Sequence, residues 1–508
     1  MDYSLKNRYV YTASEILDTS TQQQVDLDFT LPDYCADIEK ILKCSLVPKI
    51  YTRTFSAGQL RVDGASIVRI LYCDSHKKFL RCCEQTVPFS ATIPVSTEPS
   101  ESIVITTAKP EYLNCRVLTP RRLTIHGSFS LNTSVVARNV FDIKHSCDNN
   151  MLQVKTETQE ICELCEFNQE MFSVAESVNI RTNNNIETIV RSDVSALITD
   201  FAQNGEKLQI KGEATLRMLY VCDAATGDID QFVYVFPFTQ SIDAKEKNCD
   251  ITDVKLDVLS YEILLRGGLL TDEPGVSLDI KMSATVTGYK KTEVTYITDA
   301  YSVADETELE YENLTVFSDV MPVNSRFAVK SNLSLGDVPI KKIHDIFWED
   351  PNVTGQTEDK ELVVSGKVRV CILGATAEGE LVCIERQADI RYTSALSDSF
   401  SLCKCAKVCV TSVSFRMTEN NSLEIRLDMQ LSAMLYNLSD IRQVSNVTNC
   451  GEKSVSKKHP LTLYYAQKGE LVWDIAKRYS TSLESVCTEN SLDCAELENS
   501  CMLMILNV

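Results

Sequence analysis

The sequence predicts a mainly β protein with short helices, built from three repeated antiparallel β domains and a small β-α-α-β domain at the C-terminus. Three observations predict this fold class. A glycine-centred apolar segment occurs three times at nearly equal spacing, a second landmark keeps the same offset from each glycine, and the last stretch of the chain changes to a helical pattern. Self-similarity at a fixed period is the signature of a duplicated domain.

The glycine-centred segment has the form Leu-x-apolar-x-Gly and ends at Gly64, Gly212 and Gly366, each followed by an apolar run typical of a strand. We interpret the glycine as a bulge or as a place where another backbone approaches closely. The second landmark is an Ile-x-x-Ile pair upstream of each glycine, found at Ile38/Ile41, Ile186/Ile189 and Ile340/Ile343.

Within each copy, the Ile-x-x-Ile spacing predicts one helical turn with an apolar face. Most of the remainder alternates between apolar and polar residues, which predicts strands with one buried and one exposed face. We expect the three copies to span residues 1–160, 161–305 and 306–445.

The C-terminal part differs from the repeats. A polar stretch at residues 446–460 predicts a linker, and a compact domain follows at 461–508. Its first residues alternate like a strand, and the helical pattern from Leu471 to Tyr479 places apolar side chains on one face. Ser482 can cap a second helix, and the segment from Cys501 onward closes the domain as a strand.

Charge and composition exclude several classes of partner. The 508 residues contain 50 Lys and Arg against 71 Asp and Glu, a formal net charge of −21. Such an excess of negative charge repels phosphate backbones and acidic lipids, so we expect no nucleic-acid partner. No apolar stretch reaches the roughly 18 residues that a membrane-spanning helix needs, so we expect no membrane insertion.

The 20 cysteines are interpreted as reduced thiols, because the first residues show no export signal. Cys162 and Cys165 form a Cys-x-x-Cys pair without the second pair that zinc requires. Cys403, Cys405 and Cys409 follow one another along a single strand, which is poor geometry for joint ligation. We therefore expect no metal site.

No catalytic motif is present. The glycine spacing of residues 374–381 imitates a phosphate-binding loop but lacks its Lys and Ser/Thr, so it predicts a hairpin turn. The five histidines are far apart in sequence, and none lies in an acid–base motif. We expect no catalytic residues, no cofactor and no enzymatic activity.

Residues 31–42, Leu-Pro-Asp-Tyr-Cys-Ala-Asp-Ile-Glu-Lys-Ile-Leu, closely resemble the opening of the SPOCS domain. That domain is found in spore-coat-associated proteins of endospore-forming Firmicutes. The second and third copies keep the Ile-x-x-Ile pair and the glycine segment but lose Leu-Pro-Asp-Tyr, so they resemble diverged SPOCS domains.

The C-terminal domain resembles a LysM domain through its helix Trp-Asp-Ile-Ala-Lys-Arg-Tyr at 473–479 and an asparagine after the second helix. LysM domains generally bind N-acetylglucosamine polymers such as peptidoglycan through two loops. Here the usual Asp-Thr of the first loop is Glu-Leu, and the usual Pro-Gly before the last strand is missing. The resemblance places a ligand or partner contact at Gly469, Glu470, Leu471, Val472, Trp473 and Asn490. Trp473 is either a sugar platform or a core residue, and the ligand is either a glycan or a protein.

Three SPOCS-like repeats followed by one LysM domain resemble clostridial coat morphogenetic proteins. The resemblance implies a non-catalytic scaffold, made in the mother-cell cytoplasm and recruited to the forespore surface. Its LysM domain would dock to the coat's basement-layer morphogenetic ATPase, with other coat proteins as further partners. The competing interpretation is a cell-wall or cortex protein that binds peptidoglycan glycan. A third is a SPOCS–LysM protein with another role.

Overall fold

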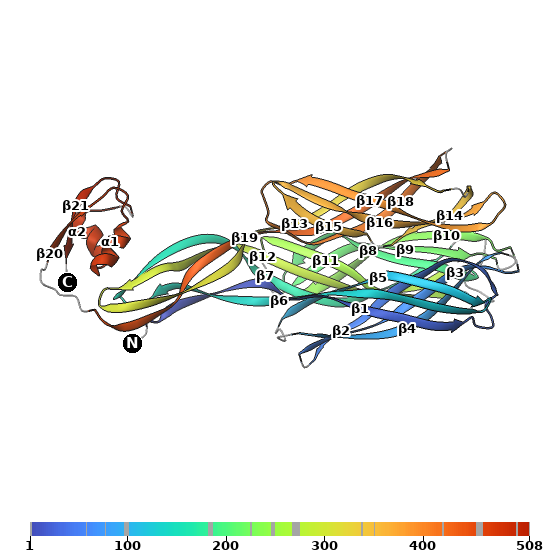
Figure 1. The fold of residues 1–508 in the computed structure, drawn as a ribbon, viewed down its shortest axis with the longest axis horizontal. Coiled ribbons are helices and arrows are strands. Elements are labelled where there is room, and N and C mark those ends of the chain that lie inside the picture. The colour runs from blue at the N-terminus through green and yellow to red at the C-terminus, as the bar shows by residue number, and fades with distance from the viewer. Residues whose placement is uncertain are drawn as a thin grey trace.

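The structure is a computed structural model of an elongated chain of long strands (Figure 1). The N-terminus and the small C-terminal module lie at the same end of the long axis. The described residues are 3–506, apart from 57, 77, 96–100, 181–185, 224–225, 245–248, 267–274, 337–338, 350, 419–420, 454–460 and 494–495.

Three successive sets of strands make up most of the chain. The first set is β1 (Leu5–Thr30), β2 (Ile38–Ser56), β3 (Gln59–Asp74), β4 (Leu80–Pro94), β5 (Ser102–Thr119) and β6 (Arg122–Cys147). The second set is β7 (Leu152–Asn179), β8 (Thr188–Asn204), β9 (Lys207–Val221), β10 (Ile229–Asp243), β11 (Ile251–Arg266) and β12 (Gly275–Ser302). The third set is β13 (Asp305–Ser334), β14 (Ile340–Trp348), β15 (Asn352–Glu358), β16 (Glu361–Thr376), β17 (Leu381–Ala395), β18 (Leu402–Thr418) and β19 (Ser422–Glu452).

The C-terminal module consists of β20 (Leu461–Ala466), α1 (Val472–Tyr479), α2 (Leu483–Asn490) and β21 (Cys501–Leu506). The predicted fold class is therefore confirmed: the described chain is mainly β with repeated antiparallel sheets, and it ends in a β-α-α-β unit.

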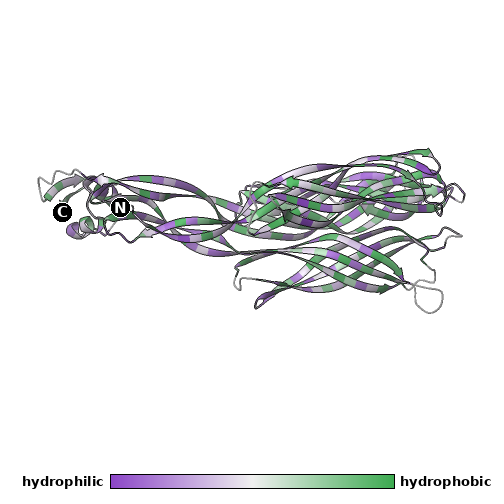
Figure 2. Ribbon diagram, turned by 90° about the horizontal axis from the view of Figure 1, so that it is seen from below, coloured by the Kyte–Doolittle hydropathy of each residue, from purple (hydrophilic) through white to green (hydrophobic). Residues whose placement is uncertain are grey.

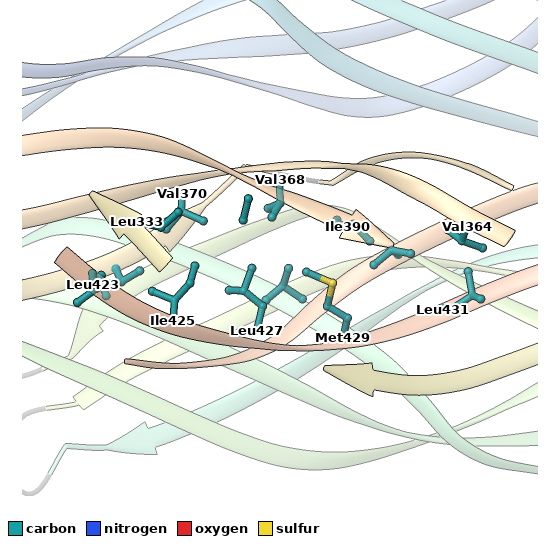
Figure 3. Close-up of a cluster of buried hydrophobic side chains, with 14 of the residues drawn as sticks. Leu333, Val364, Val368, Val370, Ile390, Leu423, Ile425, Leu427, Met429 and Leu431 are labelled. Carbon is teal, nitrogen blue, oxygen red and sulfur yellow. The ribbon is translucent and has the colours of Figure 1, made fainter. Parts of the chain in front are cut away.

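Each repeat is a sandwich of two antiparallel sheets. A sheet of long strands has the order β1-β6-β5, β11-β12-β7 or β13-β19-β18, and a sheet of shorter strands has the order β2-β3-β4, β10-β9-β8 or β14-β16-β15 with β17 on the other side of β16. The buried faces meet in one apolar core per repeat, which Figure 3 shows for the third repeat, where Leu427 and Met429 of β19 lie near Val368 and Ile390 of the facing sheet. Alternation along the strands supplies these faces (Figure 2).

The helical turn expected at each Ile-x-x-Ile pair is wrong, because the described residues of these pairs lie in or beside strands. In the first repeat, Ile38 pairs with Asp74 and Ile41 with Tyr72, because a bulge inserts one extra residue between them. Partners two apart lie on the same face of a strand, so both isoleucines face the same side. Ile340 and Ile343 pair with Thr376 and Gly374 in the same way. A β-bulge converts a spacing of two into a spacing of three, which sequence periodicity reads as helix.

The repeated glycines allow a close approach between strands, as expected. A Cβ atom at Gly212 would lie 2.6 Å from the Leu197 carbonyl oxygen and 2.6 Å from Cε1 of Phe238, the residue paired with it on β10. Gly64 has an equivalent phenylalanine across the strand pair, Phe89. The ring covers the space that a side chain would otherwise fill.

Apolar clusters also join the three repeats to one another. One cluster contains residues of all three short-strand sheets, with Leu71 and Cys73 from the first, Val190 and Leu219 from the second, and Cys371, Leu373 and others from the third. A second cluster joins the three strand pairs β1–β6, β7–β12 and β13–β19, which extend beyond the rest of their sheets as two-stranded ribbons. It consists of Val10, Ile143, Ile161, Val294, Tyr296, Leu314, Val316 and Ile441. The repeats therefore form one trunk rather than independent beads.

Two expected boundaries differ from the strands. β7 begins at Leu152, so the boundary expected at residue 160 falls inside a strand. β19 continues to Glu452, so the first part of the linker expected at 446–460 is strand, and its remainder at 454–460 lies outside the described residues. Within residues 446–452 of β19, only Val447 is fully buried, and the polar residues around it are partly or fully exposed.

Candidate functional site

The C-terminal module has its own small core. β20 and β21 pair in antiparallel fashion, and the two helices pack on one face of this sheet through Val472, Ile475, Val486 and others. The Ser482 hydroxyl accepts a hydrogen bond from the Ser485 amide at 3.1 Å and caps α2 as expected. Capping satisfies a backbone donor that would otherwise be unpaired at the helix start.

The two loops that resemble the LysM binding rim are joined to each other. The Gly469 amide donates to the Leu497 carbonyl at 2.8 Å, the Leu497 amide donates to the Glu470 carbonyl at 3.0 Å, and Leu471 forms a bridge with Glu496. Gly469 has a φ of 89°, a conformation that glycine adopts without strain. The Gly469 and Leu497 amides are therefore already engaged and do not donate hydrogen bonds to a sugar.

The Glu470 side chain is also engaged inside the module. Its carboxylate accepts hydrogen bonds from the Tyr464 hydroxyl at 2.9 and 3.1 Å and from the backbone amide of Gln467 at 3.2 Å. Arg478 donates a hydrogen bond to the Tyr464 hydroxyl oxygen at 2.9 Å, and this hydrogen bond raises the pKa of the Arg478 guanidinium. Glu470 thus shapes the turn before α1.

The remaining predicted site residues are structural in their contacts. Val472 is fully buried, and Trp473 is only 6% exposed. The Asn490 amide group donates to the Val486 and Met504 carbonyls and accepts from the Met504 amide at 2.7 Å, so it ties α2 to β21. The structure brings Gly469, Glu470 and Leu471 together at one rim, with Val472 and Trp473 beneath it and Asn490 on the sheet side.

Trp473 faces the end of the trunk rather than solvent. Its indole nitrogen donates to the Asp299 carboxylate at 2.8 Å, and its ring contacts Tyr301 edge to face at 5.0 Å between centroids. Lys477, one turn later on α1, donates to both oxygens of Asp299 at 2.6 and 2.7 Å. The module is therefore docked through α1 on the end of β12.

Further polar contacts complete the docking. The Tyr301 hydroxyl donates to the Thr481 carbonyl at 2.8 Å, and burial, together with the nearby Asp299 charge, raises the pKa of Tyr301. Lys453 donates to the Ser302 carbonyl at 2.6 Å and to the Ser480 hydroxyl at 2.9 Å. Sequence reasoning missed Asp299 and Tyr301. These residues lie on β12, far from α1 in sequence, and no local pattern marks that strand as a docking surface.

A cavity of about 1270 Å³ lies where the three repeats meet. Basic residues are prominent in its lining, but each of the following has a carboxylate partner: Lys43–Glu385 at 2.6 Å, Arg69–Glu84 at 2.5 Å, Arg191–Asp345 at 3.5 Å, Arg369–Glu349 at 2.9 Å and Lys407–Asp257 at 2.6 Å. These five cations are therefore engaged in ion pairs that cross between strands and repeats at the cavity wall.

The described residues also bear on metal binding and membrane insertion. No group of three or more His, Cys, Asp or Glu side chains among them could hold a metal ion. None of the helices in this part of the chain has the length and apolar character needed to span a membrane.

A family model described as SipL, SPOCS domain matches residues 37–118 and 185–264. The first match corresponds to β2–β5 and the second to β8–β11, so the two matches cover equivalent strands of the first two repeats. Neither match extends to the third repeat or to the C-terminal module. No curated protein and no solved structure matches the chain. Two segments of the chain, in equivalent strands of the first two repeats, are therefore similar to the SipL SPOCS domain, a similarity that suggests a role in spore coat morphogenesis.

Proposed function

We propose that this protein is a non-catalytic scaffold of spore coat assembly that docks through its C-terminal module to the coat's basement-layer morphogenetic ATPase. The observation that carries the proposal is the pair of SPOCS domains in equivalent strands of two repeats. The order of SPOCS domains followed by a LysM-like module resembles that of the coat morphogenetic protein SipL. We place the protein in the mother-cell cytoplasm, from which it is recruited to the forespore surface.

The shape of the molecule supports a scaffold. Apolar clusters shared by all three repeats make a stiff trunk, and the module lies at one end of it (Figure 1). An elongated scaffold can hold one partner at the module and other coat proteins along the trunk. Linking several binding surfaces on one chain raises the effective concentration of each partner for the next.

The geometry of the rim supports a protein partner over a glycan. The backbone groups of Gly469, Glu470 and Leu497 are paired with one another, and Glu470 is held by Tyr464. Leu471 replaces the small hydroxyl residue usual at this rim and is partly exposed. A partly exposed leucine flanked by paired backbone groups suits an apolar protein contact better than a sugar. In this proposal the accessible contact comprises Gly469, Glu470 and Leu471, and the buried Val472 and Trp473 support it from beneath.

The test uses the full chain and two immobilised targets, purified coat ATPase and insoluble peptidoglycan. We expect binding to the ATPase, and we expect Leu471→Glu to weaken it by roughly tenfold or more, because a charge replaces an apolar contact at the interface. Thr488→Glu, an exposed change on α2, is the matched control and should bind as the unsubstituted chain does.

The outcomes separate the alternatives. Unchanged ATPase binding by Leu471→Glu would move the contact away from this rim. Retention on peptidoglycan alone would make the protein a cell-wall or cortex glycan binder and would overturn the proposal. A melting temperature measured for each variant confirms that loss of binding is not loss of folding.

A further inference from the structure

The C-terminal sheet has one covered face and one open face. The helices cover the side of β20 and β21 that carries Ala466, Leu503 and Ile505. On the other side, every described outward position is apolar: Leu506 is half-buried, and the other five are between 41% and 62% exposed, namely Leu461, Leu463, Tyr465, Met502 and Met504. We call the five exposed residues the open face.

The open face is continuous rather than scattered. Leu463 pairs with Met504 and Tyr465 with Met502 across the two strands, so their side chains are direct neighbours. Exposed valines elsewhere do not form such a surface: Val233 and Val235 of β10 lie opposite Arg217 and Thr215 of β9. Contiguous exposed apolar surface is rare on a protein that works alone and marks an interaction site.

We propose that the open face pairs with the same face of a second copy of this chain, giving a dimer joined end to end. The open face carries no charge, so two identical copies meet there without placing like charges against each other. An isologous contact of this kind is self-complementary and closes at two copies. Packing two such sheets face to face would give a helix–sheet–sheet–helix stack, an ordinary layered arrangement.

The position of the module in the molecule favours a second copy of the chain as the partner of the open face. The module lies at one end of the long axis in both ribbon views, so two copies can join there while their trunks point apart (Figures 1 and 2). The chain carries a formal charge of −21, and surface charges are screened over about 8–10 Å at physiological salt. Contact through the tip keeps most of that charge outside the screening distance, whereas side-by-side contact would not.

The area available sets the expected strength. Five side chains of this size and exposure present roughly 500 Å² per copy, so a dimer would bury about 1,000 Å² in total, near the lower limit of specific interfaces. We therefore expect a reversible dimer that forms in the micromolar range or above. On a spore surface, where many copies are held close together, such a contact is strong enough to link neighbouring scaffolds.

The experiment is sedimentation equilibrium of the full chain across a wide concentration range. The average mass should rise from 56.9 kDa toward twice that value and stop there. Raising the salt concentration should strengthen the dimer, because salt screens the repulsion between two acidic chains without weakening an apolar contact.

Charge substitutions at the centre of the open face sharpen the test. Leu463→Lys and Leu463→Glu should each weaken the dimer by roughly tenfold or more, because each places like charges in a buried contact. A mixture of the two variants should regain part of the lost association, since opposite charges then face each other. Val233→Lys, an exposed valine on the trunk, is the matched control and should dimerise as the unsubstituted chain does.

Several results would overturn the proposal. The chain could remain at 56.9 kDa at every concentration, or Leu463→Lys could dimerise as well as the control. Growth beyond two copies would contradict an isologous contact. A monomeric chain in which Leu463→Lys lowers binding to the coat ATPase would assign the open face to that partner instead. Because the docking test depends on Leu471 and this one on Leu463, failure of either leaves the other interpretable.

Discussion

The trunk and the C-terminal module are held in place by different kinds of contact. The three repeats share buried apolar clusters, and basic side chains make further contacts between them. Lys49 lies over the Tyr261 ring, Arg191 lies over the Phe347 ring, and Lys43 forms an ion pair with Glu385. These contacts join the first repeat to the second, the second to the third and the third to the first. The module instead meets the trunk through a small contact, in which Tyr301 and Val303 pack against its apolar cluster and hydrogen bonds form around Asp299 and Tyr301.

This difference separates stability from attachment. Buried apolar area dominates folding free energy, so a defect inside any repeat should weaken the whole trunk. A small interface of this kind can open without unfolding either side, because most of each core lies on one side of it. The four predictions that follow test this contrast, beginning with the largest expected effect.

Gly212→Val should destabilise the trunk by roughly 3 kcal/mol or more, because a side chain there has to displace Phe238 or the backbone of β8. The melting temperature of the full chain measures the effect. Lys211→Ala, at the neighbouring exposed position of the same strand, should leave it nearly unchanged. If only part of the melting transition moved to a lower temperature, the repeats would unfold separately.

Asp299→Ala should release the module while leaving the trunk folded. The change removes the acceptor of both Trp473 and Lys477, and losing hydrogen bonds of this kind costs about 1–3 kcal/mol. With Trp348→Phe as background, Trp473 is the single tryptophan, so a red shift of its emission and access to a soluble quencher report release. Asp474→Ala on the exposed side of α1 is the control. Unchanged Trp473 emission would mean that the remaining contacts of Tyr301 and Lys453 hold the module without Asp299.

Alkaline conditions should weaken the trunk before they affect the module. Burial raises the pKa of Cys371 to about 11 and of Cys383 to about 12, above the ordinary thiol value of 9.0. A raised thiol pKa means that the folded state favours the neutral form, so its stabilising effect is complete below about pH 9 and is lost as the pH rises toward 12. Melting temperatures between pH 7 and 10.5 should fall, and native alkylation of these thiols should lag behind that of the exposed Cys405 and Cys450. Equal alkylation rates would contradict their burial.

Arg61→Ala should have the smallest effect. The Arg61 guanidinium lies 2.9 Å from Asp63, but its side chain is exposed, and an exposed ion pair contributes at most about 0.5–1 kcal/mol. The melting temperature should therefore remain close to that of the unsubstituted chain. A large drop would indicate that surface charges, and not the shared apolar clusters, hold the trunk together.

Much of the fold followed from local patterns. The spacing of Gly64, Gly212 and Gly366 predicted three copies of one domain, and the structure shows three sandwiches with equivalent sheets. Ser482 predicted the start of α2. The Ile-x-x-Ile pairs misled, because a bulge and a helical turn give the same spacing, and only strand pairing distinguishes them.

For most strands of the repeats and for α1, the sequence by itself determined which face is buried, since that information is carried by residues close together in the chain. Only the tertiary structure decided what each face is buried against. The contact of Trp473 with Asp299 and Tyr301 joins residues far apart in sequence, and the bare side of β20 and β21 differs from a covered one only by what packs there. Periodicity records the solvent exposure that a residue prefers, whereas partners depend on how distant segments meet in space.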